Sequence, residues 1–386
     1  MIHNIISNYL REKNCTLLGV GPMSKNCVDV AIEIADEYKF PLMLIASRRQ
    51  IDSAQHGGGY VNNWTTEAFS NYVKSKSKKN NILLCRDHGG PWQNNFEKNE
   101  KYSIERAMKS AKESYLVDIK SDFKVIHIDP SEDLNETPSI DTILFRIYEL
   151  YEYCWEKAKE LDKEILFEIG TEEQSGLTNT TSELDYSLSK ITDFCKIKKF
   201  PKPTFVVIQS GTKVAEMKNI GAFDSNIRIK NQLAVEIQVP QMISICNKYD
   251  VLMKAHNTDY ISNSALQSHP KLGIHAVNVA PEYGVCETRT FVDILEKYSL
   301  NYLLDEFQNL SVKSNKWNKW MLPNSNASFK EKALIAGHYV FSSPEFIEIK
   351  NEATKYLSNK SVDLDKELKK SIKKSIMRYV NNLLIV

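Results

Sequence analysis

Several residues suited to acid–base and metal chemistry follow, or lie in, short apolar runs of this sequence. Asp87 and His88 follow ILLCR, Glu168 lies in ILFEIG, and His256 follows DVLMKA. Imidazole nitrogens and carboxylate oxygens bind zinc or a neighbouring first-row ion, and three protein ligands leave one position open for substrate. The sequence therefore predicts one divalent metal, with zinc preferred, held by His88, His256 and a carboxylate, either Glu168 or Glu172.

A second set of polar residues follows the same kind of apolar run elsewhere in the chain. Such side chains can fix the orientation of a small substrate, and Glu172 or Glu173 is a candidate second acid or base. The predicted substrate-binding residues are Ser47, Arg48, Gln50, Asp129, Gln209, Asn257, Thr258 and Asn278. Arg48, Arg49, Gln50 and Asn278 are the ones expected to hold hydroxyl or phosphate groups.

The elements that must position these residues are eight apolar runs that alternate with helical patterns. The runs begin at Cys15, Pro41, Ile82, Lys124, Ile165, Thr204, Asp250 and Leu272. Near-continuous apolarity is typical of parallel strands covered on both faces. Eight such units predict an α/β fold, a (β/α)8 barrel over residues 1–300, whose loops after the strands meet at one mouth. An open doubly wound sheet is the alternative, although no GxGxxG follows the first run.

From Asn301 onward the strand repeat stops and only helical patterns remain. Residues 301–386 are therefore predicted to form a helical C-terminal subdomain. In its lysine-rich stretch KELKKSIKKSIMRY, lysines alternate with apolar residues at helical spacing. This pattern is typical of a helix with one solvated face, and a helix on a membrane surface is the alternative.

Composition narrows the classes of function. The 386 residues include 50 Lys and Arg against 49 Asp and Glu, a formal net charge of +1, whereas a dedicated nucleic-acid binder is clearly basic. No apolar run approaches the roughly 18 residues of a membrane span, and the first residues lack the apolar core of a signal peptide. Seven single cysteines without a CxxC pair indicate reduced core residues. We expect a cytoplasmic protein that binds neither nucleic acid nor membrane.

Two loops are predicted to close over bound substrate. The glycines in residues 56–60, HGGGY, allow close backbone approach, and the loop over residues 170–187 is long and rich in hydroxyls. Among the other histidines, His127 and His275 lie inside apolar runs and are interpreted as structural. The sequence leaves the roles of His56 and His338 open.

The motifs together resemble a known family. QIDSAQHGGGYVNNWT, RDHGGPWQNN, HIDPSEDL, FEIGTEEQ, VIQSG and KAHNTDYIS are similar, in this order, to the Z-subunit family of class II tagatose-1,6-bisphosphate aldolases. The resemblance covers roughly residues 20–279. It implies a (β/α)8 fold, ketose-phosphate metabolism and kinship with the zinc-dependent class II aldolases.

The resemblance also implies roles for single residues. Asp87 resembles the aspartate that handles the proton of the substrate C4 hydroxyl, His88 and His256 resemble zinc ligands, and Glu168 resembles the strand-five glutamate near the metal. Two positions depart from the pattern of the catalytic aldolases. VIQSGTK has Gln209 where a third histidine ligand is expected, and NVAPE has Pro281, which has no N–H to donate to a phosphate.

These observations predict a metal-dependent enzyme of retro-aldol chemistry on a ketose or ketose phosphate. The metal would polarise the C2 carbonyl while Asp87 takes the C4 hydroxyl proton, and Glu172 is the candidate second catalytic group. Release of the aldehyde would make the chain an aldolase, and its rotation and re-addition would make it a 4-epimerase. The alternative is a non-catalytic accessory subunit that stabilises a separate catalytic aldolase. The expected partners are a small sugar or sugar phosphate and either such a subunit or further copies of this chain.

Overall fold

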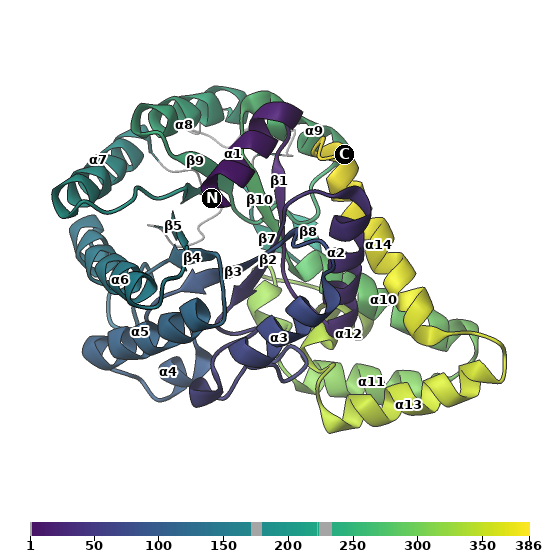
Figure 1. Ribbon diagram of the computed structural model, residues 1–386. Coiled ribbons are helices and arrows are strands. Elements are labelled where there is room, and N and C mark those ends of the chain that lie inside the picture. Colours follow the sequence, from purple (N-terminus) through teal and green to yellow (C-terminus); the bar gives the residue numbers. More distant parts are fainter. Residues whose placement is uncertain (1, 171–179, 222, 224–233) are drawn as a thin grey trace.

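A closed barrel of eight parallel strands forms the centre of the molecule in the computed structural model, which describes residues 2–170, 180–221, 223 and 234–386 (Figure 1). The sequence-based prediction of a (β/α)8 barrel is therefore confirmed. Pairing of Leu17 with Ala276 joins the first strand to the last, which excludes the open sheet. The barrel strands are β1 Leu17–Val20, β2 Leu42–Ser47, β3 Ile82–Gly89, β4 Val125–Ile128, β5 Leu166–Ile169, β6 Phe205–Ile208, β9 Leu252–Ala255 and β10 Ala276–Val279.

A ring of helices covers the outside of the barrel. Ser24, Thr65 and Ser103 precede three of these helices, and their side chains accept hydrogen bonds from first-turn backbone N–H groups. Such caps account for the serines and threonines near the helical patterns. The ring helices are α2 Lys25–Tyr38, α3 Thr66–Lys76, α5 Ile104–Lys120, α6 Ile140–Glu160, α7 Thr181–Lys198, α8 Val235–Tyr249, α9 Asn263–Leu272 and α10 Pro281–Lys297.

Three smaller elements supplement this plan. Helix α1, Ile2–Lys13, precedes the first strand, and α4, Asn95–Asn99, follows β3. A short antiparallel hairpin of β7, Val214–Ala215, and β8, Lys218–Asn219, follows β6.

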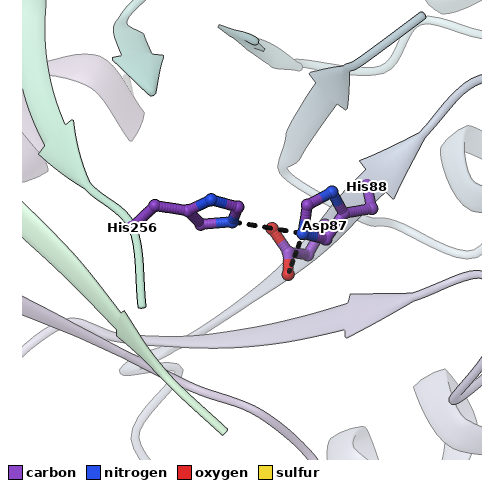
Figure 2. A group of neighbouring side chains, drawn as sticks. All are labelled: Asp87, His88 and His256. Atoms are coloured by element: carbon purple, nitrogen blue, oxygen red, sulfur yellow. Dashed lines mark hydrogen bonds and ion pairs between the residues drawn. The ribbon is translucent and has the colours of Figure 1, made fainter. Parts of the chain in front are cut away.

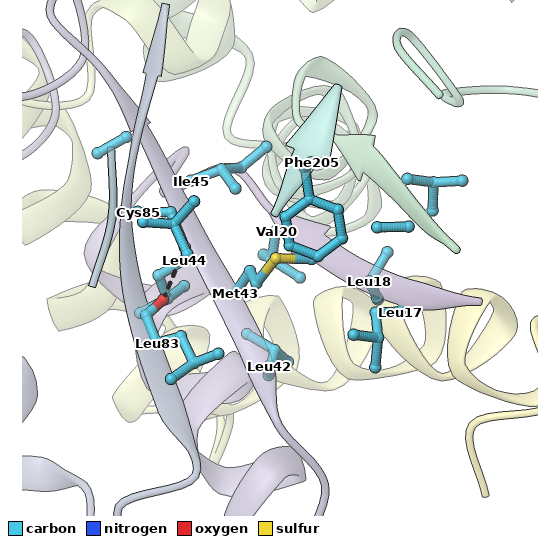
Figure 3. Packing of buried hydrophobic residues seen from close by; sticks show 14 of the residues in the cluster. Leu17, Leu18, Val20, Leu42, Met43, Leu44, Ile45, Leu83, Cys85 and Phe205 are labelled. Atoms are coloured by element: carbon cyan, nitrogen blue, oxygen red, sulfur yellow. Dashed lines mark hydrogen bonds between the residues drawn. The ribbon is translucent and has the colours of Figure 1, made fainter. Parts of the chain in front are cut away.

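The main core lies inside the barrel and between its strands and helices. Figure 3 shows Leu17, Leu18 and Val20 of β1 in this core, each at most 1% exposed. Consecutive strand residues point to opposite faces, so both the barrel interior and the helix-facing side are apolar. This is the physical reason that the strands read as continuous apolar runs. The polar residues at the strand ends lie beyond this core.

The C-terminal helices form a second apolar cluster together with α10. Phe291 of α10 packs edge-on against Phe307, with ring centroids 5.1 Å apart, and Phe346 contacts both rings. These helices are α11 Asn301–Lys313, α12 Phe329–Ala336, α13 Pro344–Ser358 and α14 Leu364–Asn382. Figure 1 shows α11 and α13 outside the ring of barrel helices.

Helix α14 links the two clusters. Its first turns, with Leu364 and Leu368, belong to the C-terminal cluster, whereas Ile376 and Tyr379 are buried in the main core. Figure 1 shows α14 running back along the barrel towards α9. Its polar face pairs with the barrel helix α2, because Lys369 Nζ lies 2.7 Å from Asp29. The apolar face of this lysine-rich helix is thus covered by protein, and no described helix is long and apolar enough to span a membrane.

We predict that truncating Ile376 of α14 destabilises the whole barrel. Ile376 is fully buried in the main core, so Ile376→Ala should lower the free energy of unfolding by about 2–5 kcal/mol. The matched control is Ile347→Ala on α13, where the side chain is 48% exposed and a change within about 0.5 kcal/mol is expected. Urea unfolding measures both. Equal stability of the two variants would contradict the placement of α14.

Candidate functional site

A cavity of about 860 Å³ lies at the carboxyl ends of the barrel strands. Asp87 and His88 lie at its floor on β3, and His256 reaches it from the end of β9 (Figure 2). Strand β3 keeps its pairing with β4 only after a register shift between Arg86 and Gly89, and His88 has a φ of +44°. This turn at the strand end lets two adjacent side chains face the same cavity, at an expected strain of about 1–3 kcal/mol.

His88 and His256 face each other through their Nε2 atoms. These atoms lie 3.1 Å apart, and His88 Nε2 is 4.0 Å from Asp87 Oδ2 (Figure 2). On the other side of the ring, His88 Nδ1 lies 2.8 Å from Asp129 Oδ2. Burial opposes the charged form of His88, but Asp87 and Asp129 outweigh it and raise the pKa of the ring, so a metal at Nε2 would have to displace a proton there while Asp129 holds the proton at Nδ1.

This arrangement fits a divalent metal. Two ligands on one tetrahedral zinc, with Zn–N of about 2.0–2.1 Å, lie roughly 3.3 Å apart, close to the separation of the two imidazole nitrogens. Burial and the charge of His88 lower the pKa of His256 to about 3, so its ring is neutral, as a ligand must be. Asp87, His88 and His256 bring one oxygen and two nitrogens within 4.8 Å of one another.

Asp87 is held as a carboxylate. Burial alone would raise its pKa, but the charge of His88 and the contact with His127 outweigh burial and hold the pKa well below its usual range. Asn278 Nδ2 donates to Asp87 Oδ1 across 3.2 Å. The same logic applies to Asp129, whose pKa falls to about 2 because His88 outweighs burial.

A second group of ionisable side chains lies below Asp87 in the barrel. His127 Nδ1 on β4 is 3.5 Å from Asp87 Oδ1 and 3.6 Å from Glu168 Oε1. Glu168 Oε2 accepts from Lys254 Nζ at 2.7 Å, and both side chains are only 1% exposed. Glu168 therefore shares a possible ligand group with Asp87 and His127, and not with His88 and His256.

His127 and Lys254 are site residues that the sequence analysis missed. The sequence favours a structural role for His127, whereas the structure places this ring against Asp87. The signal is available in strand alternation: His127 is two residues before Asp129, and Lys254 is two residues before His256. Residues i and i+2 of a strand share a face, so each points into the barrel with a residue already assigned to the site.

The other predicted residues differ in whether they line the cavity. Ser47, Gln50, Asn257 and Asn278 line it. Gln50 Oε1 accepts from the Ser47 backbone N–H at 2.9 Å, so these two also brace each other. Gln209 and Thr258 are buried and are not among the cavity-lining residues. Glu172 and Glu173 lie outside the described residues, as does the rest of residues 171–179. The last part of the predicted loop over residues 170–187, from Thr181 onward, is the first part of α7.

Arg48 lies at the cavity wall, but its guanidinium is already engaged. Its Nε lies 2.9 Å from Asp52, its Nη2 lies 2.6 Å from Glu97, and it is 1% exposed. His56 joins the same network through Ser53, at 2.8 Å. Both residues are thus placed to brace the loop after β2. Gly58, Gly59 and Tyr60 of that loop line the cavity.

Two further histidines, His275 and His338, lie away from the floor of the cavity. His275 Nδ1 accepts from the Met253 backbone N–H at 3.1 Å, which makes it a link between strands. His338 is buried beside Gly284, where the C-terminal helices meet α10, and burial lowers its pKa to about 3. Neither side chain lines the cavity.

Helices α10 and α14 hold the loop that follows His256. Asp259 Oδ1 accepts the backbone N–H groups of Ala280 and Glu282, at 3.0 and 2.9 Å, and so caps α10. Glu282 in turn accepts from Arg378 at 3.1 Å and from the Tyr379 hydroxyl, both on α14. Burial and the charge of Glu282 raise the pKa of Asp259 to about 7.

Comparison with known proteins identifies the family. The model of the D-tagatose-1,6-bisphosphate aldolase subunit GatZ/KbaZ-like family matches residues 2–297, so the chain belongs to this family and the resemblance seen in the sequence is confirmed. Membership places the chain among aldolase-like proteins of carbohydrate metabolism. No curated protein sequence matches this one.

Solved structures share the fold at low sequence identity. A probable tagatose 6-phosphate kinase from Sinorhizobium meliloti 1021 has a TM-score of 0.73 at 14% identity, over 95% of this chain and 100% of its own. The fructuronate-tagaturonate epimerase UxaE from Cohnella laeviribosi has a TM-score of 0.58 at 12% identity, over 96% and 81%. The fructose-bisphosphate aldolase from Campylobacter jejuni has a TM-score of 0.54 at 12% identity, over 99% and 94%.

We predict that His256→Ala lowers metal occupancy. Removal of one of the two facing imidazoles leaves His88 Nε2 without its nearest nitrogen neighbour, so zinc binding should weaken by about tenfold or more. Elemental analysis of the purified chain and zinc titration measure this. The control is His275→Ala, a histidine outside the cavity, which should retain zinc. Full occupancy in His256→Ala would contradict the ligand assignment.

We also predict that Asp259→Asn flattens the pH dependence of stability. The folded pKa of Asp259 is raised above the unfolded value of about 3.9, so the native state loses stability as pH rises from about 4 through about 7. The amide of the variant keeps an oxygen for both backbone donors but does not titrate. Urea unfolding measures this. Between about pH 4 and pH 8, the free energy of unfolding of the variant should rise relative to that of the parent by on the order of a few kcal/mol. Parallel pH profiles would contradict the expectation.

Proposed function

We propose that this chain is a metal-dependent enzyme that carries out retro-aldol chemistry on a ketose or ketose phosphate, as an aldolase or as a ketose 4-epimerase, in the cytoplasm. The observation that carries the proposal is the position of one ionised carboxylate, Asp87, beside the facing pair His88 and His256 at the floor of a single cavity. Retro-aldol cleavage needs a base for a hydroxyl proton and an electrophile for a carbonyl, side by side.

His88 and His256 are the proposed metal ligands, and Glu168 stays the predicted third ligand. When bound, a divalent ion supplies Lewis-acid polarisation of the ketose carbonyl. The Asp129 carboxylate orients His88 for this task through the 2.8 Å contact at Nδ1. Glu168 would need to exchange part of its contact with Lys254 to reach the ion.

Asp87 is the proposed general base. It takes the proton of the C4 hydroxyl, and the C4–O bond becomes a carbonyl as the C3–C4 bond breaks. The electron pair of that bond moves to C3 and the C2 carbonyl. In an aldolase the aldehyde leaves and C3 is protonated. In an epimerase the aldehyde rotates, C3 attacks its other face, and Asp87 returns the proton to the C4 oxygen.

The neighbours of Asp87 suit this role. Asn278 fixes Oδ1, so Oδ2 is the oxygen that faces His88 and the cavity. Asp87 is 8% exposed, which leaves a narrow approach for one substrate hydroxyl. Below it, the His127 ring lies between Asp87 and the buried Lys254–Glu168 pair.

The accessory-subunit function remains the second candidate, because the matching family is described as an aldolase subunit. In that case the chain would stabilise a catalytic partner and need neither metal nor turnover. Against it stands the physical disadvantage of burying Asp87, Glu168 and Lys254 together, since burying charges costs several kcal/mol per ion before compensation. A purely structural barrel has no need of them.

We predict that Asp87→Asn keeps zinc and loses turnover. The amide preserves the shape of the side chain but accepts no proton, so the rate should fall by about 10²–10⁴-fold. NMR of the zinc-loaded chain with a panel of ketoses and ketose phosphates measures the rate, and elemental analysis measures the metal. The matched control is Asp185→Asn, a carboxylate on the surface of α7 that pairs with Lys248.

Three outcomes separate the candidates. Turnover by the parent and by Asp185→Asn, but not by Asp87→Asn, supports the enzyme. Undiminished turnover in Asp87→Asn removes the base assignment. Absence of turnover in the zinc-loaded parent over the whole panel favours the accessory subunit.

A further inference from the structure

The outer half of the cavity is strongly cationic. Five basic side chains and one carboxylate line it, in contrast to the acidic and imidazole groups at the floor; they are Arg49, Lys98, Lys213, Lys316, Lys319 and Glu132. Glu132 pairs with Arg49, at 3.1 Å, and with Lys98. Lys213, Lys316 and Lys319 have no ion pair with a carboxylate in the described ranges of the chain. The wall therefore carries an uncompensated positive charge.

Two of these cations come from separate parts of the fold. Arg49 follows β2 of the barrel, and Lys319 lies in the short 3₁₀ helix Asn318–Trp320 of the C-terminal region. Arg49 Nε is buried and has no hydrogen-bond partner among the residues that the structure describes. Enclosure by the cavity walls and the like charge of Arg49 lower the pKa of Lys319 to about 8. The Arg49 guanidinium and the Lys319 ammonium thus line the same cavity and repel each other.

The segment that carries Lys319 is fastened to the barrel mouth. The Glu216 backbone N–H, in the turn between β7 and β8, donates to the Trp320 carbonyl at 2.9 Å, and the Glu216 carboxylate accepts from Leu322 N–H at 3.2 Å. Trp320 Nε1 donates to the Tyr339 hydroxyl at 3.1 Å, and Tyr339 packs on Tyr60 with ring centroids 4.8 Å apart. The ammonium of Lys319 lies 4.6 Å from the Trp320 ring centroid.

From these contacts we infer that Arg49 and Lys319 form a binding site for the anionic terminal group of the substrate, with the C-terminal region supplying one half of it. An anion placed between the two cations would accept hydrogen bonds from their side chains and remove the repulsion between the like charges. Arg49 also lies within electrostatic range of His88 and Asp129, so the site opens into the same cavity as the floor residues. The assignment rests on the proposed function, because it orients a ketose with its reacting carbons at the floor.

The chemistry shared by the possible ligands is a terminal oxyanion, either a phosphate or a carboxylate. A phosphate has more acceptor oxygens for the guanidinium and ammonium groups, and a carboxylate can pair with Arg49 in two-point fashion. Pro281, also at the cavity wall, has no N–H to donate, so the anion cannot rely on a backbone donor at that position. Arg49 and Lys319 supply side-chain donors to such an anion.

The test is binding of simple anions to the purified full-length chain, without turnover. Isothermal titration calorimetry with inorganic phosphate, and separately with acetate, compares the parent with Lys319→Met, which keeps the apolar stem of the side chain. Removal of one charge-assisted contact should weaken binding by about tenfold or more. The matched control is Lys355→Met on α13, an exposed lysine outside the cavity, which should bind as the parent does. Thermal unfolding checks that each variant is folded.

Each result has one meaning. Phosphate binding that is lost in Lys319→Met supports a phosphorylated substrate, and acetate binding that is tighter and lost in the same way supports a sugar acid. Binding unchanged in Lys319→Met, or no binding of either anion by the parent, overturns the site. Because no turnover is measured, these failures are distinct from failure of the retro-aldol proposal, which the Asp87→Asn rates decide. Arg49→Gln serves as a second variant and should weaken the binding of the same anion.

Discussion

The burial of Asp87 as a carboxylate is the constraint on which the rest of the site depends. A charge in the barrel interior is unfavourable unless opposite charges and hydrogen-bond donors surround it. Here the compensation comes from around the barrel: His88 on its own strand, His127 on β4 and Asn278 on β10. Most of these elements are far apart in sequence. Closure of the barrel by the β1–β10 pairing is therefore a condition for the chemistry as well as for the fold.

The alternation of apolar and polar residues was sufficient to predict the barrel and the meeting of Asp87, His88 and His256. Position after a strand decides which side chains reach the mouth, and that position is readable from sequence. The ionisable residues inside the barrel are harder to assign to the site from the sequence, because His127 and Lys254 lie within apolar runs and look like parts of the core. Only the two-residue repeat along each strand shows that they share a face with Asp129 and His256.

Arg48 and Arg49 show where reading from sequence stops. Both follow β2, and nothing local separates them. In the structure Arg48 turns into the ion pairs with Asp52 and Glu97, whereas Arg49 faces the cavity with an unpartnered Nε. The contribution of Lys319 was equally out of reach, since it depends on how a helical region far along the chain packs against the barrel mouth. Tertiary contacts, which no residue pattern encodes locally, make these assignments.

The return of α14 to the barrel has a consequence for the order of folding during synthesis. Roughly 85 residues separate the end of β10 at Val279 from the start of α14 at Leu364. At about 5–20 residues per second, a ribosome needs several seconds to make this stretch. Until then the loop after His256 lacks the Arg378 and Tyr379 contacts that hold Glu282. The nascent barrel can thus close its sheet while one wall of its cavity is still unanchored.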